Sequence, residues 1–441
     1  MIWLLGILTL LIAGFVFKLG LLVYSMYVMF GVLIVGRWLA RKWIGGLDVI
    51  RDCNLDEAEV GDVAAVVLTV RNRGALPIAW LIVEDAVPQA AIVERPHRLK
   101  VTGPRLAVTA LKRNEEKVLL YQVQFLSRGY FPLGPTLLES GDPFGLHRRF
   151  RIAGKPKCVL VYPRIVPLLT VDIKTRRPLG EVRMTHRLFE DPTRISGVRM
   201  YHHGDPLRKV HWQATARTGR LHSKIFEPSC ITGATVVLDF HQQGYDESLS
   251  RRVSELAVTT AASLCNAVWQ LGQQVGLISN GLDAAERLQR DGWSGDFLMR
   301  KFKKPPREGV ESEPMEPVVI ETGRGGALND EIMKSLARLE LSRGLPFHEL
   351  ILETEYLMPR DAAVVVVLAS VTESVAIALG NLRRRGYSVS AVVVMDSVDV
   401  PHEWARPPEW AHLLLVEGIS FNVVDSADTL AEFASSELIR S

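Results

Sequence analysis

The most restrictive feature of this sequence is an N-terminal stretch that is almost entirely apolar. Met1–Phe17 is apolar throughout and Leu19–Val35 is nearly so, with Lys18 and Gly20 between the two runs. A helix needs about 20 apolar residues, with a usual range of about 17–25, to cross the hydrocarbon of a bilayer. Because the connection is short, the runs predict an antiparallel transmembrane hairpin over residues 1–43.

Two alternatives to a membrane hairpin fit the sequence less well. A cleaved signal peptide needs a basic segment before the apolar run and a cleavage site after it, and neither is present. A soluble domain would have difficulty burying so long an apolar stretch. Arg37, Arg41 and Lys42 follow the second run, whereas the turn carries only Lys18. The positive-inside rule therefore predicts a multi-pass protein of the cell (inner) membrane, with its soluble portion in the cytoplasm.

Composition limits the classes of partner and cofactor. The chain has 441 residues and a formal net charge of only +3, so no electrostatic footprint for nucleic acid is present. The N-terminal apolar stretch predicts that the lipid bilayer is one partner of the chain. The four cysteines are far apart and form no Cys-x-x-Cys pair, so neither a zinc knuckle nor a disulfide framework is indicated. We expect no cofactor.

Residues 46–170 have the pattern of an antiparallel β-sandwich. Short runs alternate between apolar and polar residues and are separated by turn residues. The predicted strands are Ala64–Val70, Ile78–Val83, Val118–Phe125 and Val159–Tyr162. Two Gly- and Pro-rich segments, Ser127–Pro135 and Gly141–Leu146, are interpreted as tight corner turns whose aromatic residues pack on the core.

Residues 232–441 alternate between strands and helices, which predicts an open, doubly wound α/β sheet. The predicted strands are Ala234–Leu238, Val275–Ile278, Val318–Ile320, Val364–Leu368, Val389–Val394 and Ser420–Val424. A capping box at Ser370–Glu373 predicts the start of one helix. Residues 284–317 break the rhythm and predict a mobile surface insertion.

The connector at 171–231 carries the most distinctive motif. It runs Arg-x-Tyr-x-x-Gly-Asp, followed by an Arg, a Trp and Ala-Arg. The residues concerned are Arg199, Tyr201, Gly204, Asp205, Arg208, Trp212, Ala216 and Arg217. This motif resembles the signature of the domain-of-unknown-function family fifty-eight. The flanking Asp142–Leu146 and Tyr162-Pro163 also resemble that family, as does the order of hairpin, sandwich and doubly wound domain.

The resemblance implies a membrane-anchored protein with a von Willebrand factor type A-like domain. It also implies two partners, a MoxR-type AAA+ ATPase and a transglutaminase-like membrane protein. The activity of the class is not established, so the resemblance suggests a context and no reaction.

The chemistry of the motif leaves three interpretations open. The first is an interdomain clasp in which Asp205 pairs with an arginine and Trp212 fills the seam. The second is an anion or partner-peptide site built by the arginines. The third is a metal site from the motif histidines and Asp205, which needs a fixed second set of contacts to orient them. The histidines are His202, His203 and His211.

Domains of the von Willebrand A type often hold Mg²⁺ through Asp-x-Ser-x-Ser after their first strand, because a hard cation prefers oxygen ligands. Here the corresponding residues are Asp239, His241 and Gln243, so both serines are replaced. The later aspartate of that family is absent near Ala369-Ser370, and Thr322 could replace the middle-loop threonine. The degenerate position therefore predicts no metal.

Two function classes remain. The first is a non-enzymatic scaffold or adaptor that works with the AAA+ ATPase in envelope-related assembly or complex maturation. The second is an envelope-associated enzyme, either a hydrolase or an acyl transferase. The sequence contains no Gly-x-Ser-x-Gly, His-Glu-x-x-His or Walker-type loop. His222 lies near Cys230 in sequence, but no third group marks them as a catalytic pair. We therefore expect a scaffold.

Overall fold

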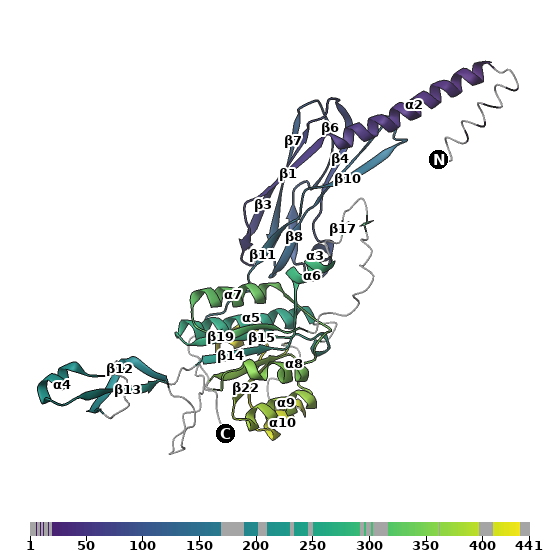
Figure 1. The fold of residues 1–441 in the computed structure, drawn as a ribbon. Coiled ribbons are helices and arrows are strands. Elements are labelled where there is room, and N and C mark those ends of the chain that lie inside the picture. Colours follow the sequence, from purple (N-terminus) through teal and green to yellow (C-terminus); the bar gives the residue numbers. More distant parts are fainter. Residues whose placement is uncertain are drawn as a thin grey trace. The chain divides into compact units, whose positions relative to one another are not determined.

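The computed structural model divides into two compact units, which are described separately (Figure 1). The described residues are 20–168, 189–201, 210–229, 233–245, 250–291, 295–296, 301–302, 316–360, 362–396 and 409–432, with Gly6, Thr9, Ile12 and Val16. Unit 1 comprises Met1–Arg164, Asp283–Glu311 and Leu336–Leu339. Unit 2 comprises Ile165–Leu282, Ser312–Ser335 and Glu340–Ser441.

Unit 1 begins with the apolar helix α2 (Gly20–Gly45). Within the described part of the chain, its segment Val23–Gly45 is the one helix long and apolar enough to cross a membrane. The first helix of the predicted hairpin lies almost wholly outside the described residues, so a second crossing is not shown. The helix α2 continues past Leu39 because its last turn, with Trp43 and Ile44, is buried in the core of unit 1.

The rest of unit 1 consists mainly of antiparallel sheets. One sheet has the order β1 (Leu47–Cys53), β3 (Val63–Asn72), β7 (Glu116–Phe125) and β5 (Leu99–Thr102). A second has the order β10 (Arg148–Ala153), β9 (Thr136–Gly141), β4 (Ile78–Asp85) and β6 (Leu106–Leu111). A third has the order β2 (Glu57–Ala58), β11 (Lys157–Val161) and β8 (Gly129–Leu133). The four predicted strands are confirmed, but β11 pairs with β2 in parallel.

The two four-stranded sheets bury a common apolar core. Along β3 every second residue from Ala64 to Val70 is buried, as expected for a strand with one face on a core. Leu68 of β3 belongs to the same cluster of buried residues as Leu81 of β4 and Leu138 of β9. The alternation of apolar and polar residues in the sequence therefore predicted correctly which face of this strand is buried.

The two predicted corner turns have different outcomes. The first segment contains the strand β8, so the predicted tight turn over Ser127–Pro135 is wrong. Its aromatic plug is confirmed, because Phe131 is buried and stacks on Phe125 with 5.9 Å between ring centroids. In the second, Phe144 is 71% exposed, so the expectation that it packs on the core is wrong. The physical reason is that Asp142 turns the loop outward, as described below.

A buried ion pair lies between the sheets of unit 1. The guanidinium of Arg51 on β1 contacts the carboxylate of Asp85 on β4, and both side chains are almost completely buried. Asp85 also accepts hydrogen bonds from the hydroxyls of Tyr121 (2.6 Å) and Thr136 (2.9 Å). The burial and the Asp85 charge raise the pKa of Tyr121, so the phenol stays protonated and remains a donor.

Unit 2 contains a six-stranded mixed sheet. Its order is β19 (Val318–Gly323), β15 (Gln274–Ser279), β14 (Gly233–Leu238), β21 (Ala363–Leu368), β22 (Ser388–Val394) and β23 (Ser420–Val424). Five strands are parallel and β19 is antiparallel to β15. The predicted strands are confirmed. The direction of β19 was not predicted, because a short apolar run carries no information on strand direction.

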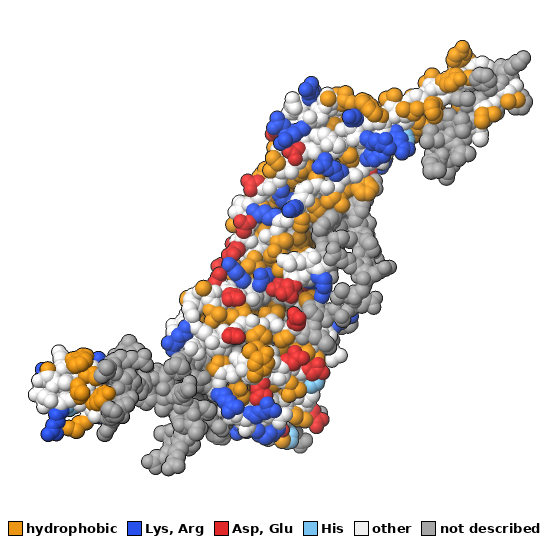
Figure 2. Space-filling view, viewed as in Figure 1, with side chains coloured by type: hydrophobic (Ala, Val, Ile, Leu, Met, Phe, Trp, Pro, Cys, Tyr) orange, Lys and Arg blue, Asp and Glu red, His pale blue; other side chains and the backbone are white. Residues whose placement is uncertain are grey.

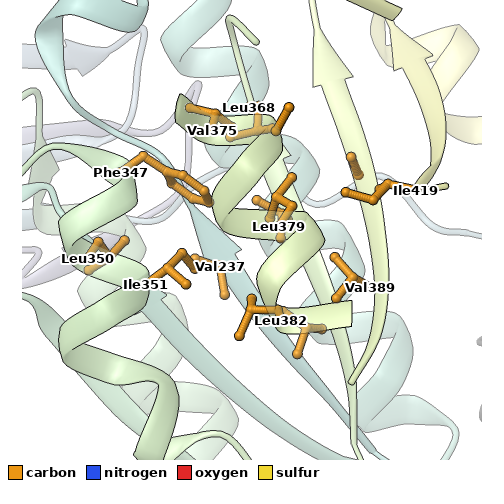
Figure 3. Close-up of a cluster of buried hydrophobic side chains, with 14 of the residues drawn as sticks. Val237, Phe347, Leu350, Ile351, Leu368, Val375, Leu379, Leu382, Val389 and Ile419 are labelled. Carbon is orange, nitrogen blue, oxygen red and sulfur yellow. The ribbon is translucent and has the colours of Figure 1, made fainter. Parts of the chain in front are cut away.

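Helices cover both faces of this sheet, as a parallel sheet requires. The helices α5 (Ser250–Gln270) and α7 (Gly326–Arg338) lie on one face (Figure 1). The helices α8 (Phe347–Thr354), α9 (Glu373–Arg384) and α10 (Glu409–Val416) lie on the other (Figure 1). Phe347, Leu379 and Val237 meet in the core of this second face (Figure 3). The helix α11 (Ala427–Glu432) follows β23.

Several predicted boundaries after residue 232 need correction. The N-cap of α9 is Thr372, whose hydroxyl accepts from the N–H of Val375, so the predicted capping box at Ser370–Glu373 is wrong. The helices α8 and α10 were not predicted. The segment 284–317 begins with the helix α6 (Ala284–Asp291) and contains the paired strands β17 (Gly295–Asp296) and β18 (Lys301–Phe302).

We predict that Asp85→Ala strongly destabilises unit 1. The change leaves the buried guanidinium of Arg51 without its carboxylate, and breaking a buried ion pair costs about 3–5 kcal/mol. The matched control is Glu116→Ala, which breaks the exposed pair between Arg71 and Glu116 and should cost at most about 1 kcal/mol. Urea unfolding of the full chain in detergent measures both. Equal losses in the two variants would contradict the prediction.

Candidate functional site

The first candidate site lies at the carboxyl edge of the central sheet of unit 2. The chain leaves β14 toward β15 on one side and returns to β21 on the other, so the strand order reverses between β14 and β21. In open α/β sheets, ligands bind in the crevice at such a switch point. Asp239 follows β14 directly and Ser370 follows β21 by two residues. The predicted degenerate position therefore lies where this fold places ligands.

Asp239 forms hydrogen bonds with neighbouring residues of the same edge. Its Oδ1 accepts from the side-chain amide of Asn280 at 2.9 Å and from the N–H of His241 at 3.2 Å. Its carbonyl oxygen accepts from the hydroxyl of Tyr245 at 2.7 Å. The carboxylate is almost completely buried. Its oxygen Oδ2 lies 3.7 Å from the point where a Cβ on Gly244 would stand, and the Ser370 hydroxyl lies 3.4 Å from that point.

Asn280 is a site residue that the sequence interpretation missed. It follows β15, and it donates to Asp239 and to the carbonyl of Leu345 while accepting from the N–H of Phe240 at 2.6 Å. It therefore ties together the loops after two neighbouring strands. The available signal was its position, since a polar residue directly after a buried parallel strand lies at the ligand edge of the sheet.

His241 and Gln243 do not converge on a ligand position. His241 caps the short 3₁₀ helix η2 (Gln242–Gly244), and its Nδ1 accepts from the N–H of Gln243 at 3.3 Å. Gln243 is exposed. Thr322, considered as a replacement for the middle-loop threonine, lies within β19, and its hydroxyl forms a hydrogen bond of 2.8 Å with the hydroxyl of Thr235. It therefore belongs to the sheet and does not contribute a metal ligand at the carboxyl edge.

These residues fit a divalent cation poorly. Mg²⁺ prefers several oxygen ligands in near-octahedral geometry. Asp239 is the only carboxylate of the degenerate position, and its Oδ1 already accepts two hydrogen bonds. Among the described residues no group of three or more His, Cys, Asp or Glu is arranged to hold a metal. Burial raises the pKa of the Asp239 carboxyl, although Asn280 and the His241 N–H partly oppose that shift.

The second candidate site is the motif hairpin, which we define as β12 (Phe189–Met200), α4 (Trp212–Thr218) and β13 (His222–Ser229). The two strands pair antiparallel from Phe189–Ser229 to Met200–His222 with two irregularities. Val210 bridges to Ser223, which returns the chain to the hairpin before α4 begins. The structure thus brings Arg199, Tyr201, Trp212 and Arg217 onto one hairpin.

Polar caps hold α4 in place. The ring Nδ1 of His211 accepts from the N–H of Ala214 at 3.1 Å, and Gly219 ends the helix in the left-handed conformation at φ 70°. This use of the His211 ring competes with the interpretation of the motif as a metal site. Gly204, Asp205 and Arg208 lie outside the described residues, as do His202, His203 and Cys230. His222, which lies near Cys230 in sequence, has its Nδ1 2.7 Å from the carbonyl oxygen of Arg220.

Trp212 is an exposed residue of the motif hairpin. Its side chain is 68% exposed, and α4 buries none of its residues. The clasp interpretation concerns a seam between domains and stays a prediction. Other apolar residues of the hairpin, which sequence reasoning missed, are exposed as well, namely Val198, Met200 and Leu221. Arg217 of α4 is also exposed.

Residues 197–290 match the family described as "Protein of unknown function DUF58". This match covers Arg199, Trp212 and Arg217 of the motif together with Asp239 and Asn280 of the sheet edge. The chain is therefore similar to that family over residues 197–290. The flanking sandwich, which the sequence resemblance included, lies outside the match.

The chain is also similar to the uncharacterised protein YeaD of Bacillus subtilis, with 24% identity over 233 residues. The alignment covers 52% of this chain and 55% of YeaD, so the chain spans about half the length of that relative.

Two solved structures are similar to parts of the chain. The von Willebrand factor type A protein of Catenulispora acidiphila is 9% identical over 48% of this chain and 42% of its own, with a TM-score of 0.28. The CARDB domain of the PF1109 protein of Pyrococcus furiosus is 18% identical over 26% of this chain and 91% of its own, with a TM-score of 0.19.

We predict that Asp239→Asn raises the melting temperature at neutral pH. Since burial raises the folded pKa of Asp239, the folded chain retains a proton that the unfolded chain has already released above the ordinary aspartate pKa. Stability therefore falls as the pH rises through that window, and asparagine removes this fall. A rise of roughly 2–4 °C corresponds to about 1 kcal/mol in a domain of 150–250 residues. Melting curves of parent and variant across mildly acidic to neutral pH measure it.

The same melting curves test metal binding. A chelator or added Mg²⁺ should leave the melting temperature of the parent unchanged. If Mg²⁺ raised it by several degrees and Asp239→Asn abolished that rise, Asp239 would be a metal ligand and the interpretation above would be overturned.

Proposed function

We propose that this chain is a membrane-anchored scaffold whose motif hairpin docks a protein partner. The anchor is α2, and the cell (inner) membrane is its location, with the soluble units in the cytoplasm. The partner that the motif resemblance suggests is a MoxR-type AAA+ ATPase, and a transglutaminase-like membrane protein is a second. The scaffold would serve envelope-related assembly or complex maturation.

The observation that carries the proposal is the exposed Trp212. Tryptophan, tyrosine and arginine are the residue types that dominate binding energy at protein interfaces. The exposed part of this side chain could contribute roughly 2–3 kcal/mol when a partner covers it. Arg217, in the last turn of the same helix, adds a donor suited to a carboxylate. The helix α4 thus carries an apolar residue that can anchor a partner and a charged residue that can add specificity.

The charges at the end of α2 support the orientation. Arg37, Arg41 and Lys42 are exposed on α2, beyond its apolar part. Basic residues that follow a membrane span favour the cytoplasmic side. That side also contains the ATP that an AAA+ partner requires.

The alternative, an envelope-associated hydrolase or acyl transferase, has less support. Its best candidate acid or base is Asp239, because a buried carboxyl with a raised pKa at a switch point is a common feature of active sites. However, Asp239 is almost completely buried and its Oδ1 is occupied by Asn280 and His241. Its hydrogen bonds favour a structural role in joining the edge loops.

We predict that Trp212→Ala weakens binding to the MoxR-type ATPase of the same organism without lowering the melting temperature. Loss of roughly 2–3 kcal/mol corresponds to about 30- to 150-fold in Kd. The measurement is biolayer interferometry between the detergent-solubilised full chain and the purified ATPase.

Tyr356→Ala is the matched control for Trp212→Ala, because Tyr356 is an aromatic residue of unit 2 that is 80% exposed. It should bind like the parent. Parent-like binding by Trp212→Ala, or equal losses in both variants, would argue against the hairpin as the docking surface.

We predict that a cysteine at Gly20 reacts with a membrane-impermeant maleimide in intact cells, whereas a cysteine at Val108 reacts only after lysis. Gly20 lies at the predicted outer turn, and Val108 is exposed on β6 of the sandwich. The background lacks the four native cysteines. Labelling at Val108 in intact cells would reverse the orientation and exclude a cytoplasmic ATPase as partner.

A further inference from the structure

The exposed loop between β9 and β10 has a rigid frame built by one carboxylate. Asp142 is buried, and its side chain accepts from the N–H groups of Phe144 (3.2 Å) and His147. Its carbonyl oxygen accepts from the indole N–H of Trp80 at 3.1 Å and from the N–H of Gly145 at 3.0 Å. The frame turns the tip of the loop outward, so Phe144 and Leu146 are exposed although both are large and apolar.

This loop lies against α2 at the end of its apolar part. A Cβ on Gly36 would stand 3.1 Å from the Cβ of Asp142 and 3.5 Å from the ring of His147. Gly36 directly precedes Arg37, the first charged residue of α2. At 1.5 Å per residue, Gly36 is about 24 Å along the helix from Gly20, whereas the hydrocarbon is about 30 Å thick. The loop therefore meets α2 near the level at which the helix leaves the hydrocarbon.

The surroundings of the loop are basic. Arg148 and Arg149 on β10 are exposed, and so are Arg37, Arg41 and Lys42 on α2. Neither residues 1–47 nor residues 143–155 contain an Asp or Glu. Figure 2 shows Lys and Arg side chains gathered on the end of the sandwich from which α2 leaves, beside the apolar side chains of α2. Trp38 is exposed at this level, where aromatic side chains favour the membrane interface.

We propose that the loop 141–147 is a second membrane contact, which inserts Phe144 and Leu146 into the bilayer interface while Arg148 and Arg149 bind anionic lipid headgroups. The bilayer is the one in which α2 is embedded, so this inference rests on the anchoring role proposed for α2. Apolar tips beside basic residues are the composition of surfaces that bind anionic membranes. The loop and the helix together would fix the tilt of the sandwich on the membrane, because two contacts remove the rotation that one helix allows.

The test uses the full chain reconstituted in vesicles of phosphatidylglycerol with phosphatidylcholine, or of phosphatidylcholine alone. The photo-crosslinker p-benzoylphenylalanine replaces Phe144, and in a matched chain it replaces Val118, an exposed apolar residue on β7 of the same sandwich. After irradiation, lipid adducts are counted by mass spectrometry. Many adducts at position 144 and few at position 118 are the expected result, whereas equal yields would overturn the proposal.

The charge of the contact is tested in the same assay. Arg148→Glu with Arg149→Glu should reduce the adducts at position 144 about fivefold or more in vesicles with phosphatidylglycerol, and less in phosphatidylcholine alone. The control pair, Lys100→Glu with Lys117→Glu, reverses two exposed charges elsewhere in the sandwich and should change little. If the number of adducts at position 144 changed neither with the arginine substitutions nor with the lipid charge, the headgroup contact would be refuted.

Flotation of each sample separates this inference from the anchoring role. A chain that floats with the vesicles but gives no adducts at position 144 is anchored and its loop is undocked. A chain that does not float has lost the anchor itself, which would contradict the proposed function as well.

Discussion

The structure of unit 1 depends on α2 being a single helix that runs from solvent into the core. Its apolar part is largely exposed up to Val35, while Ala40, Trp43 and Ile44 in its last turns are buried against the sandwich. Removing those side chains from water stabilises the join by an amount that grows with apolar area, roughly 25 cal/mol per Å². Gly36 allows the helix to approach the 141–147 loop, because any side chain there would press on Asp142. The apolar helix is therefore continuous with the core of unit 1.

The two units solve the problem of buried carboxylates differently. In unit 1, Asp85 meets the guanidinium of Arg51, so two opposite charges share one buried position. In unit 2, Asp239 has the neutral amide of Asn280 and a backbone N–H, and burial raises its pKa. In the first case an opposite charge offsets the cost of burying the carboxylate. In the second case only an amide and a backbone N–H offset that cost, and a buried carboxyl of this kind is typical of positions that connect loops or contact ligands.

The sequence predicted the elements of both units more reliably than their contacts. Alternation along Ala64–Val70 and the continuous apolar run Val364–Leu368 depend on the faces that a strand buries, and both strands form as expected. The burial of Phe144 was predicted wrongly because an aromatic residue in a Gly- and Pro-rich turn has the same local pattern whether the loop points inward or outward. The exposure of Trp212 on the hairpin was not evident from the sequence either, since its neighbours in space are set by the pairing of β12 with β13. Asn280 was missed because its partners Asp239 and Leu345 are distant in sequence.

The helix α4 gives a physical reason to expect a partner at the motif hairpin. Isolated helices shorter than about 12–15 residues are marginal in water, and helices in proteins depend on a buried apolar face for most of their stability. The helix α4 has 7 residues and buries none of them, so the caps at His211 and Gly219 and the flanking strands hold it without a core. Yet its first residue is tryptophan, which gains most from burial. A helix that presents such a residue and has no interior of its own gains stability when another surface covers it.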